Sequence, residues 1–174
     1  MKTMILPGFS IKNKDWAYET KKALEPEIPA EVVEWDHWTT NNTSFADWGE
    51  WMKVEVSRVA KKMEGEKLNI LAKSIGTAVA MNILKTNPNT VNKLVLCGIP
   101  LRDLGEEEKK SYQILKTFPD NNFICIQNEQ DNHGSFEEIR EFLHSINPNL
   151  KVISKPADTH DYPYSEEFTN ALKG

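Results

Sequence analysis

The sequence predicts an α/β fold, a three-layer α/β/α domain whose sheet of about six strands is mostly parallel. Short apolar runs alternate with longer, charge-rich amphipathic segments along all 174 residues. Runs that are apolar at nearly every position are typical of strands buried on both faces. Strands that alternate with helices form βαβ units, and the length suits one core, so we expect residues 1–174 to fold as a single domain.

Six runs are expected as strands because each is short and rich in Val, Ile or Leu. They cover residues 3–6, 32–35, 68–72, 94–96, 123–126 and 150–153. Functional groups of a parallel sheet belong at the carboxyl ends of its strands. The segments that follow these runs therefore hold the candidate site.

The segments between the runs have helical patterns. In residues 44–63, Ser44 is a helix cap, Asp47 completes a variant of the capping box, and the apolar residues step by three or four. Ser135 and Glu138 form the same box before another amphipathic segment. Residues 77–84, 106–118 and 164–172 are also expected to be helical, giving about six helices in all.

The turn after the third strand carries the strongest functional signal. Ala72-Lys73-Ser74-Ile75-Gly76 joins that strand to a helix, with Ser74 at the apex. A serine in a strained turn needs small neighbours two residues away on each side, and Ala72 and Gly76 meet this demand. The pentapeptide resembles the nucleophile elbow, G-x-S-x-G, of the α/β-hydrolase family, and Lys73 resembles the K-S-x-G form of dienelactone-hydrolase-like relatives. The resemblance implies that Ser74 is a nucleophile; a serine that only caps the helix is the alternative.

The same resemblance implies an acid and a base, which follow the serine in that order in this family. Asp131 follows the fifth run, where the acid would lie, and His160 follows the sixth, where the base would lie. Glu129 is the alternative acid and His133 the alternative base. The two remaining histidines, His37 and His144, have no matching context, and Asp158 and Asp161 are expected to be solvated loop charges.

Nucleophilic catalysis by serine needs a histidine and a carboxylate beside it, because a serine hydroxyl is a poor nucleophile at neutral pH. A neutral imidazole takes its proton as the attack proceeds. A carboxylate on the other ring nitrogen fixes the tautomer and stabilises the imidazolium.

Acyl transfer also needs hydrogen-bond donors for the developing oxyanion. The resemblance implies the backbone N–H of Ile75 as one donor. The loop Leu6-Pro7-Gly8-Phe9-Ser10 resembles the family's H-G-x-G loop, with Pro7 in place of His and Ser10 in place of the second Gly, and it implies the Phe9 N–H as the other. An ordinary glycine turn is the alternative. Trp38, after the second run, either borders the pocket or packs in the core.

The expected activity is a carboxylesterase-like hydrolysis of a small ester, thioester or amide. The triad of Ser74, Asp131 and His160 would form an acyl-enzyme intermediate and need neither a metal nor an organic cofactor. No insertion is long enough for a lid domain, and residues 99–105 supply at most a short flap. Two alternatives differ in class: a non-catalytic binding protein on the same fold, and a nucleotide binder, for which a single glycine in the first loop is too few.

Composition and charge limit the classes of partner that we expect. The net charge is −5 and no cluster of Lys and Arg is present, which argues against nucleic acid as a partner. No apolar run approaches the length of a membrane span, and the N-terminal apolar stretch is too short for a signal peptide, so we expect a cytoplasmic protein with a small-molecule acyl substrate. Cys97 and Cys125 lie in apolar runs and are expected in the core.

Overall fold

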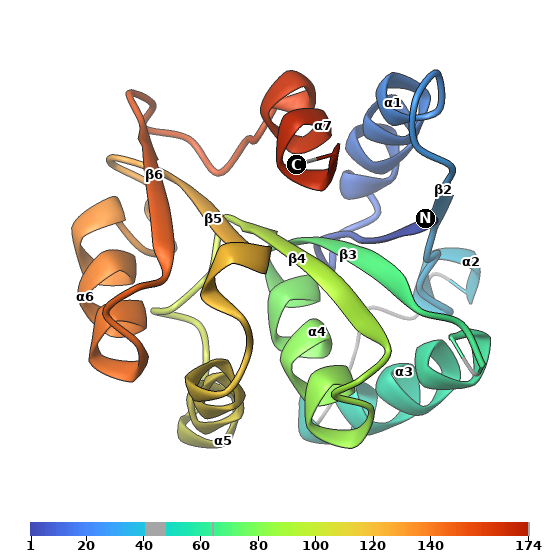
Figure 1. The fold of residues 1–174 in the computed structure, drawn as a ribbon, viewed down its shortest axis with the longest axis horizontal. Helices are drawn as coiled ribbons and strands as arrows, with labels where there is room; N and C mark the ends of the chain where they lie inside the picture. The colour runs from blue at the N-terminus through green and yellow to red at the C-terminus, as the bar shows by residue number, and fades with distance from the viewer. Residues whose placement is uncertain (41–47, 64, 174) are drawn as a thin grey trace.

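A computed structural model describes residues 1–40, 48–63 and 65–173. Its sheet has the strand order β2-β1-β3-β4-β5-β6, and every neighbouring pair is parallel (Figure 1). The strands are β1 (Thr3–Leu6), β2 (Ala30–Val32), β3 (Leu68–Lys73), β4 (Val91–Cys97), β5 (Phe123–Asn128) and β6 (Lys151–Lys155).

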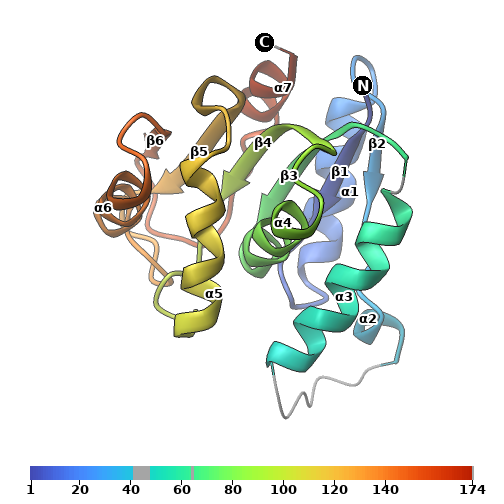
Figure 2. The ribbon, with the colours of Figure 1, turned by 60° about the horizontal axis from the view of Figure 1, so that its bottom comes forward.

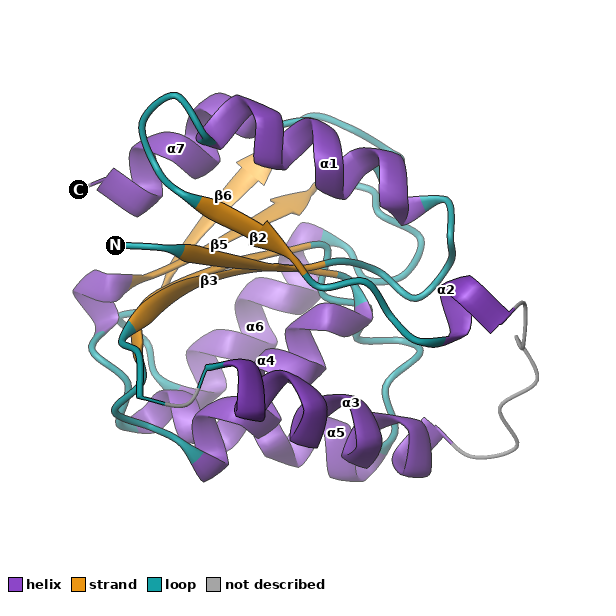
Figure 3. Cartoon of the chain, turned by 90° about the vertical axis from the view of Figure 1, so that its right-hand side faces the viewer, coloured by secondary structure: helices purple, strands orange, loops and turns teal. Residues whose placement is uncertain are grey.

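Helices cover both faces of this sheet. They are α1 (Asn13–Leu24), α2 (His37–Thr40), α3 (Trp48–Lys62), α4 (Ile75–Thr86), α5 (Glu106–Ser111), α6 (Phe136–Ile146) and α7 (Ser165–Lys173), with two 3-10 turns at Tyr112–Lys116 and Asp120–Asn122. Figure 3 shows α1 and α7 on one face and α3 to α6 on the other. The three-layer α/β/α prediction is therefore confirmed. None of the helices in the described part of the chain is long and apolar enough to cross a membrane.

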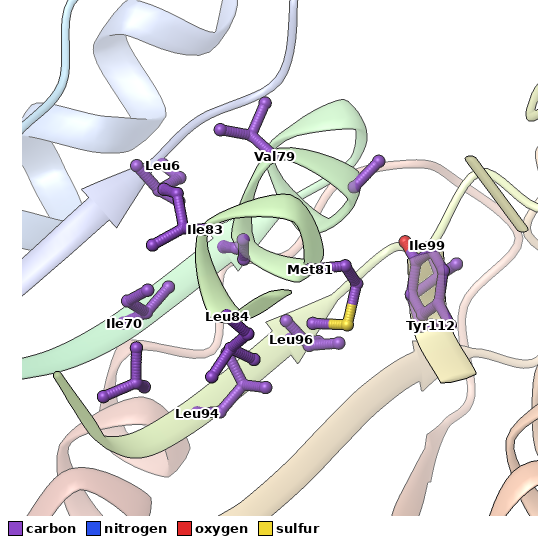
Figure 4. Close-up of a cluster of buried hydrophobic side chains, with 14 of the residues drawn as sticks. Leu6, Ile70, Val79, Met81, Ile83, Leu84, Leu94, Leu96, Ile99 and Tyr112 are labelled. Atoms are coloured by element: carbon purple, nitrogen blue, oxygen red, sulfur yellow. The ribbon is translucent and has the colours of Figure 1, made fainter. Parts of the chain in front are cut away.

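Helix α4 is the best-anchored helix of the fold. It lies between α3 and α5 against the sheet (Figure 2), and nine of its 12 residues are buried. Figure 4 shows its side chains Ile83 and Leu84 packed over Ile70 of β3 and Leu94 of β4. Each such side chain contributes about 1.5–3 kcal/mol when fully buried. The start of α4, where the nucleophile turn lies, is consequently held by a rigid element.

The topology places a crevice at that same point. From β1 the chain passes to β2 on one side, and then to β3 on the other side of β1. Ligands of parallel α/β sheets bind at the carboxyl ends of the strands where the winding direction changes in this way. The loop after β1 and the turn after β3 both open into this crevice.

Two sequence predictions differ from the structure. The strand expected at residues 32–35 is β2, which ends at Val32; beyond Val33 the chain turns so that Trp35 packs in the core. Its apolar character reflects burial, because core packing and strand pairing select the same residue types.

The second difference is the helix expected at residues 106–118. It is interrupted, because α5 ends at Ser111 and a 3-10 turn follows. The capping box of Ser135 and Glu138 is confirmed, as is the burial of both cysteines. The expected cap of α3 at Ser44 and Asp47 lies outside the described residues.

Candidate active site

Ser74 occupies a strained turn between β3 and α4. Its φ of 56° and ψ of −129° make it the single non-glycine residue with positive φ in the described ranges. Such a conformation costs of order 1–3 kcal/mol and persists only where the surroundings enforce it. Here the Ser74 N–H donates to the Cys97 carbonyl (3.0 Å), and the Thr77 hydroxyl donates to the Ser74 carbonyl (2.6 Å). The Tyr112 hydroxyl in turn contacts the Thr77 hydroxyl at 2.6 Å.

Gly76 meets the steric demand that the sequence suggested. A Cβ atom at this position would lie 2.2 Å from the Leu6 carbonyl oxygen and 2.8 Å from that of Pro7. Neither backbone atom can move without disturbing β1. Ala72, on the other side of the turn, is fully buried. The first turn of α4 therefore lies directly against the end of β1.

The three residues predicted as a triad form one hydrogen-bonded chain. His160 Nε2 lies 2.9 Å from Ser74 Oγ, and His160 Nδ1 lies 2.7 Å from Asp131 Oδ2. A carboxylate only accepts, so Nδ1 carries the proton that faces Asp131 and Nε2 accepts from the serine hydroxyl. This tautomer is the one a general base needs.

Asp131 is 1% exposed yet well supplied with donors. Its Oδ1 accepts from the His133 backbone N–H (2.8 Å), and its Oδ2 accepts from the Tyr162 hydroxyl (2.5 Å) as well as from His160. Burial acts to raise the pKa of Asp131, but the hydrogen bonds from His160, Tyr162 and the backbone outweigh it, and the pKa lies below its ordinary value. The carboxyl group is therefore ionised at neutral pH.

The alternative acid points elsewhere. Glu129 is exposed, and its Oε1 accepts from the Ser154 hydroxyl at 3.0 Å. Its backbone N–H donates to the Lys155 carbonyl, which fixes it beside β6.

The alternative bases also have other partners. His133 Nδ1 lies 2.5 Å from Asp103 Oδ2, and its ring is 4.3 Å from that of His160, centroid to centroid. His144 contacts the Leu150 carbonyl (3.0 Å) and His37 the Phe9 carbonyl (2.7 Å). Within the described ranges, His160 is the histidine in hydrogen-bond contact with Ser74.

Both predicted oxyanion donors border the same cavity as Ser74. Ile75 is the first residue of α4, where backbone N–H groups lack intrahelical acceptors and the helix dipole favours negative charge. Phe9 follows β1, and its carbonyl is directed away from the cavity toward His37 and Trp38. The structure thus brings Phe9, Ile75 and Ser74 together.

The cavity has a volume of about 670 Å³. Ser74 and His160 lie in it, and its apolar lining is supplied by Phe9, Met52, Ile75, Pro100 and Leu104. Residues 99–105, expected as a short flap, contribute one wall of it. A second cavity of about 630 Å³ lies between α3 and α4 and shares only Met52 with the first, so it is remote from the nucleophile turn.

Sequence reasoning missed Tyr162, which is fully buried and donates to Asp131. Its ring packs on Gly98, where φ is +59° and a Cβ atom would lie 2.5 Å from the Tyr162 ring. The available signal was a tyrosine two residues after His160, followed by proline. Trp38 packs in the core and does not line the cavity, so the packing interpretation holds for it.

Lys73, noted for its place before the serine, points to the other face of the sheet. It is 4% exposed, its Nζ donates to Asn13 Oδ1 at 3.0 Å, and it lies over the Trp16 ring. Burial lowers the pKa of Lys73. Asn13 is the first residue of α1 and borders the cavity, so its hydrogen bond with Lys73 links α1 to the nucleophile turn.

Comparison with known proteins identifies the family of the fold. Residues 40–170, about three quarters of the chain, match the model of the alpha/beta hydrolase domain. That match spans Ser74, Asp131 and His160, while the Phe9 loop precedes it. The comparison with curated proteins gave no match.

Solved structures share the fold at low sequence identity. A lidless α/β serine hydrolase from Xanthomonas campestris is 16% identical with a TM-score of 0.70, covering 99% of this chain and 78% of that one. An α/β serine hydrolase homologue from Coxiella burnetii is 15% identical with a TM-score of 0.69, covering 99% and 83%. A Thermus thermophilus protein is 12% identical with a TM-score of 0.72, covering 99% and 87%. Because the family model matches about three quarters of the chain, the chain belongs to the α/β-hydrolase superfamily.

Proposed function

We propose that this chain is a serine hydrolase that cleaves a small ester, thioester or amide through an acyl-enzyme intermediate. The observation that carries the proposal is the hydrogen-bonded chain from Ser74 Oγ through His160 to Asp131, at the edge of an apolar cavity. Ser74 is the nucleophile, His160 the general base and Asp131 the acid that orients it.

In the first half-reaction, Ser74 Oγ attacks the carbonyl carbon while its proton passes to His160 Nε2. The negative charge that develops on the carbonyl oxygen is stabilised by the N–H groups of Ile75 and Phe9. Each such donor is worth roughly 10²–10³ in rate in other hydrolases. When the tetrahedral intermediate collapses, the bond to the leaving group breaks and His160 returns the proton to the departing oxygen, sulfur or nitrogen.

In the second half-reaction, a water molecule takes the place of the leaving group. His160 accepts its proton, the hydroxyl attacks the acyl carbon, and the bond to Ser74 Oγ breaks as His160 reprotonates the serine. The ionised Asp131 stabilises the imidazolium in both steps, and the low pKa of Asp131 supports this role.

The cavity favours substrates of limited size and without negative charge. Its apolar walls suit a short acyl or leaving group. Among the described residues that line it, Asp103 and Glu108 carry carboxylates, and none is a lysine or an arginine. Anionic substrates would be repelled by these carboxylates, so neutral esters are the first class to assay.

Labelling with a fluorophosphonate probe tests the proposal. We expect the wild type to be labelled, and Ser74→Ala and His160→Ala to remain unlabelled while keeping the wild-type circular dichroism spectrum. His144→Ala is the control, because this histidine hydrogen-bonds the Leu150 carbonyl and lies outside the cavity. A folded wild type that takes up no probe would overturn the proposal in favour of a non-catalytic binding protein.

A further inference from the structure

We propose that His37, together with Trp38, is a positioning residue that fixes the second oxyanion donor by holding the Phe9 carbonyl. This role rests on the proposed serine-hydrolase function. Neither residue lines the cavity, and both act through the backbone of the loop after β1.

Three ring N–H groups from one short segment converge on two consecutive carbonyls. Trp35 Nε1 donates to the Gly8 carbonyl (3.1 Å), whereas His37 Nε2 and Trp38 Nε1 both donate to the Phe9 carbonyl (2.7 Å each). A carbonyl only accepts, so His37 carries its proton on Nε2 in this arrangement. The exposed fractions of the three side chains are 0%, 4% and 8% in the order of the chain. The bond to Gly8 is buried, and the two bonds to Phe9 are partly buried.

The carbonyl bonds fix where the neighbouring N–H groups point. All peptide bonds in the described residues are trans, and in a trans peptide the carbonyl and the following N–H point in opposite directions. Because the Gly8 carbonyl is directed at Trp35, the Phe9 N–H is directed away from it. Because the Phe9 carbonyl is directed at His37 and Trp38, that end of the residue cannot rotate without breaking two hydrogen bonds.

Ring packing fixes the same residue a second time. The Phe9 ring stacks on the His37 ring with centroids 4.0 Å apart and an interplanar angle of 21°. The edge of Trp51 of α3 lies against both, at 5.2 Å from Phe9 and 5.8 Å from His37. His37 therefore holds Phe9 at its carbonyl and at its side chain.

The segment that carries these rings is itself clamped to α3. Arg58 Nη2 donates to the Glu34 carbonyl (2.8 Å), and the Asp36 N–H donates to Glu55 Oε1 (3.3 Å). Glu55 is 1% exposed and pairs with Arg58. Trp35 thus lies between two backbone groups that α3 holds, which gives the loop after β1 a rigid support.

Rigidity matters here because an oxyanion donor is effective only when it is preorganised. Donors aimed at the developing charge stabilise it without reorganisation, whereas a donor that must first rotate into place loses that advantage. The loop after β1 has no regular secondary structure from Pro7 to Ser10 other than a bend, so its own backbone does not provide this order. The rings of residues 35–38 provide it instead.

The experiment compares variants that remove the donors in turn. His37→Phe keeps a ring to stack on Phe9 but removes the N–H, His37→Gln keeps an N–H donor, and Trp38→Phe removes the second donor. We measure kcat and KM for a neutral p-nitrophenyl ester, together with the inhibition constant of a trifluoromethyl ketone, whose adduct with a serine carries the oxyanion.

We expect kcat to fall about tenfold in His37→Phe and about a hundredfold in the double variant with Trp38→Phe, at the scale of a weakened or lost oxyanion donor. KM should change little, and His37→Gln should recover most of the activity. The inhibition constant of the ketone should rise by the same factor by which kcat/KM falls. A residue that only stabilised the fold would change the melting temperature but would not produce this match.

His144→Phe is the control, because it removes the imidazole bond from His144 of α6 to the Leu150 carbonyl, away from the cavity. It should leave kcat unchanged. A folded double variant with wild-type kcat and wild-type affinity for the ketone would overturn the positioning role alone. A wild type without esterase turnover and without fluorophosphonate labelling would overturn the proposed function and this role with it.

Discussion

The two sides of the cavity differ in how their chemistry is encoded. On the side of His160, the groups proposed to react are side chains, and each lies just after a strand of the sheet. On the side of Phe9, the proposed donor is a backbone N–H, and its position depends on rings that lie 27 to 29 residues further along the chain. Reacting side chains leave a pattern of residue types, whereas a backbone donor leaves none of its own.

The largest effect is expected where the acid is replaced. Asp131→Asn should lower kcat by about 10⁴-fold, because the amide favours the wrong imidazole tautomer and no longer stabilises the imidazolium. Glu129→Gln is the matched control and should stay near wild type, since its carboxylate contacts Ser154 and not His160. Steady-state kinetics with a short p-nitrophenyl ester measure both. Loss of activity in Glu129→Gln with an active Asp131→Asn would reverse the assignment of the acid.

The next effect is expected at Gly76, where the first turn of α4 contacts the end of β1. Gly76→Ala would press a methyl group against the Leu6 carbonyl, so we expect it to destabilise the fold by about 1–3 kcal/mol or more. Gly105→Ala is the control, because its added Cβ meets only the end of the flexible Glu108 side chain. Urea denaturation compares the two, and equal midpoints would show that the end of β1 does not constrain the turn.

A stability loss of similar size is expected at Tyr162, with a defined pH dependence. Tyr162→Phe removes a hydrogen bond to a charged carboxylate and should cost about 1.5–3 kcal/mol of stability at neutral pH. Burial raises the pKa of Asp131 but its hydrogen bonds more than offset this, so the folded pKa lies below the ordinary one. The stabilisation is therefore present above the ordinary pKa and is lost as the pH falls through the folded pKa.

The loss of unfolding free energy in Tyr162→Phe should accordingly become smaller when urea denaturation is measured below about pH 4. Tyr112→Phe is the control, because Tyr112 contacts the neutral Thr77 hydroxyl and its cost should not depend on pH in this range. A cost for Tyr162→Phe that is the same at both ends of the series would contradict the ionised state assigned to Asp131.

The smallest effect is expected at the alternative base. His133→Ala should change kcat by less than about threefold, because His133 contacts Asp103 and the His160 ring but makes no hydrogen bond to Ser74. The same ester assay measures it. A loss as large as that of His160→Ala would mean that His133 transfers the proton.

The sequence allowed much of the fold and one side of the site to be predicted. The strand ends at Lys73, Asn128 and Lys155 each precede a proposed catalytic residue, and the order of the three residue types along the chain distinguished them from their neighbours. Gly76 was identified because a strained serine turn needs small residues two positions away, and the structure shows that a larger side chain there would meet the Leu6 carbonyl.

The rest depended on contacts that no local pattern encodes. Tyr162 and His37 act through partners far away in the sequence, and a lone buried tyrosine or histidine has the same appearance in a sequence whether it orders a site or fills a core. The bounds of the strand expected at residues 32–35 were wrong for a related reason. Trp35 is apolar because it packs in the core and bonds Gly8, not because it pairs with β1.

Trapping the acyl-enzyme tests the central claim most directly. The wild type is mixed with a neutral p-nitrophenyl ester, quenched in acid during turnover, and analysed by intact mass and peptide mapping, with Ser74→Ala treated in parallel. The account predicts a mass gain of one acyl group on the peptide that contains Ser74, and no gain in the variant. Ester turnover without any acylated peptide, or with the acyl group on another residue, would contradict it.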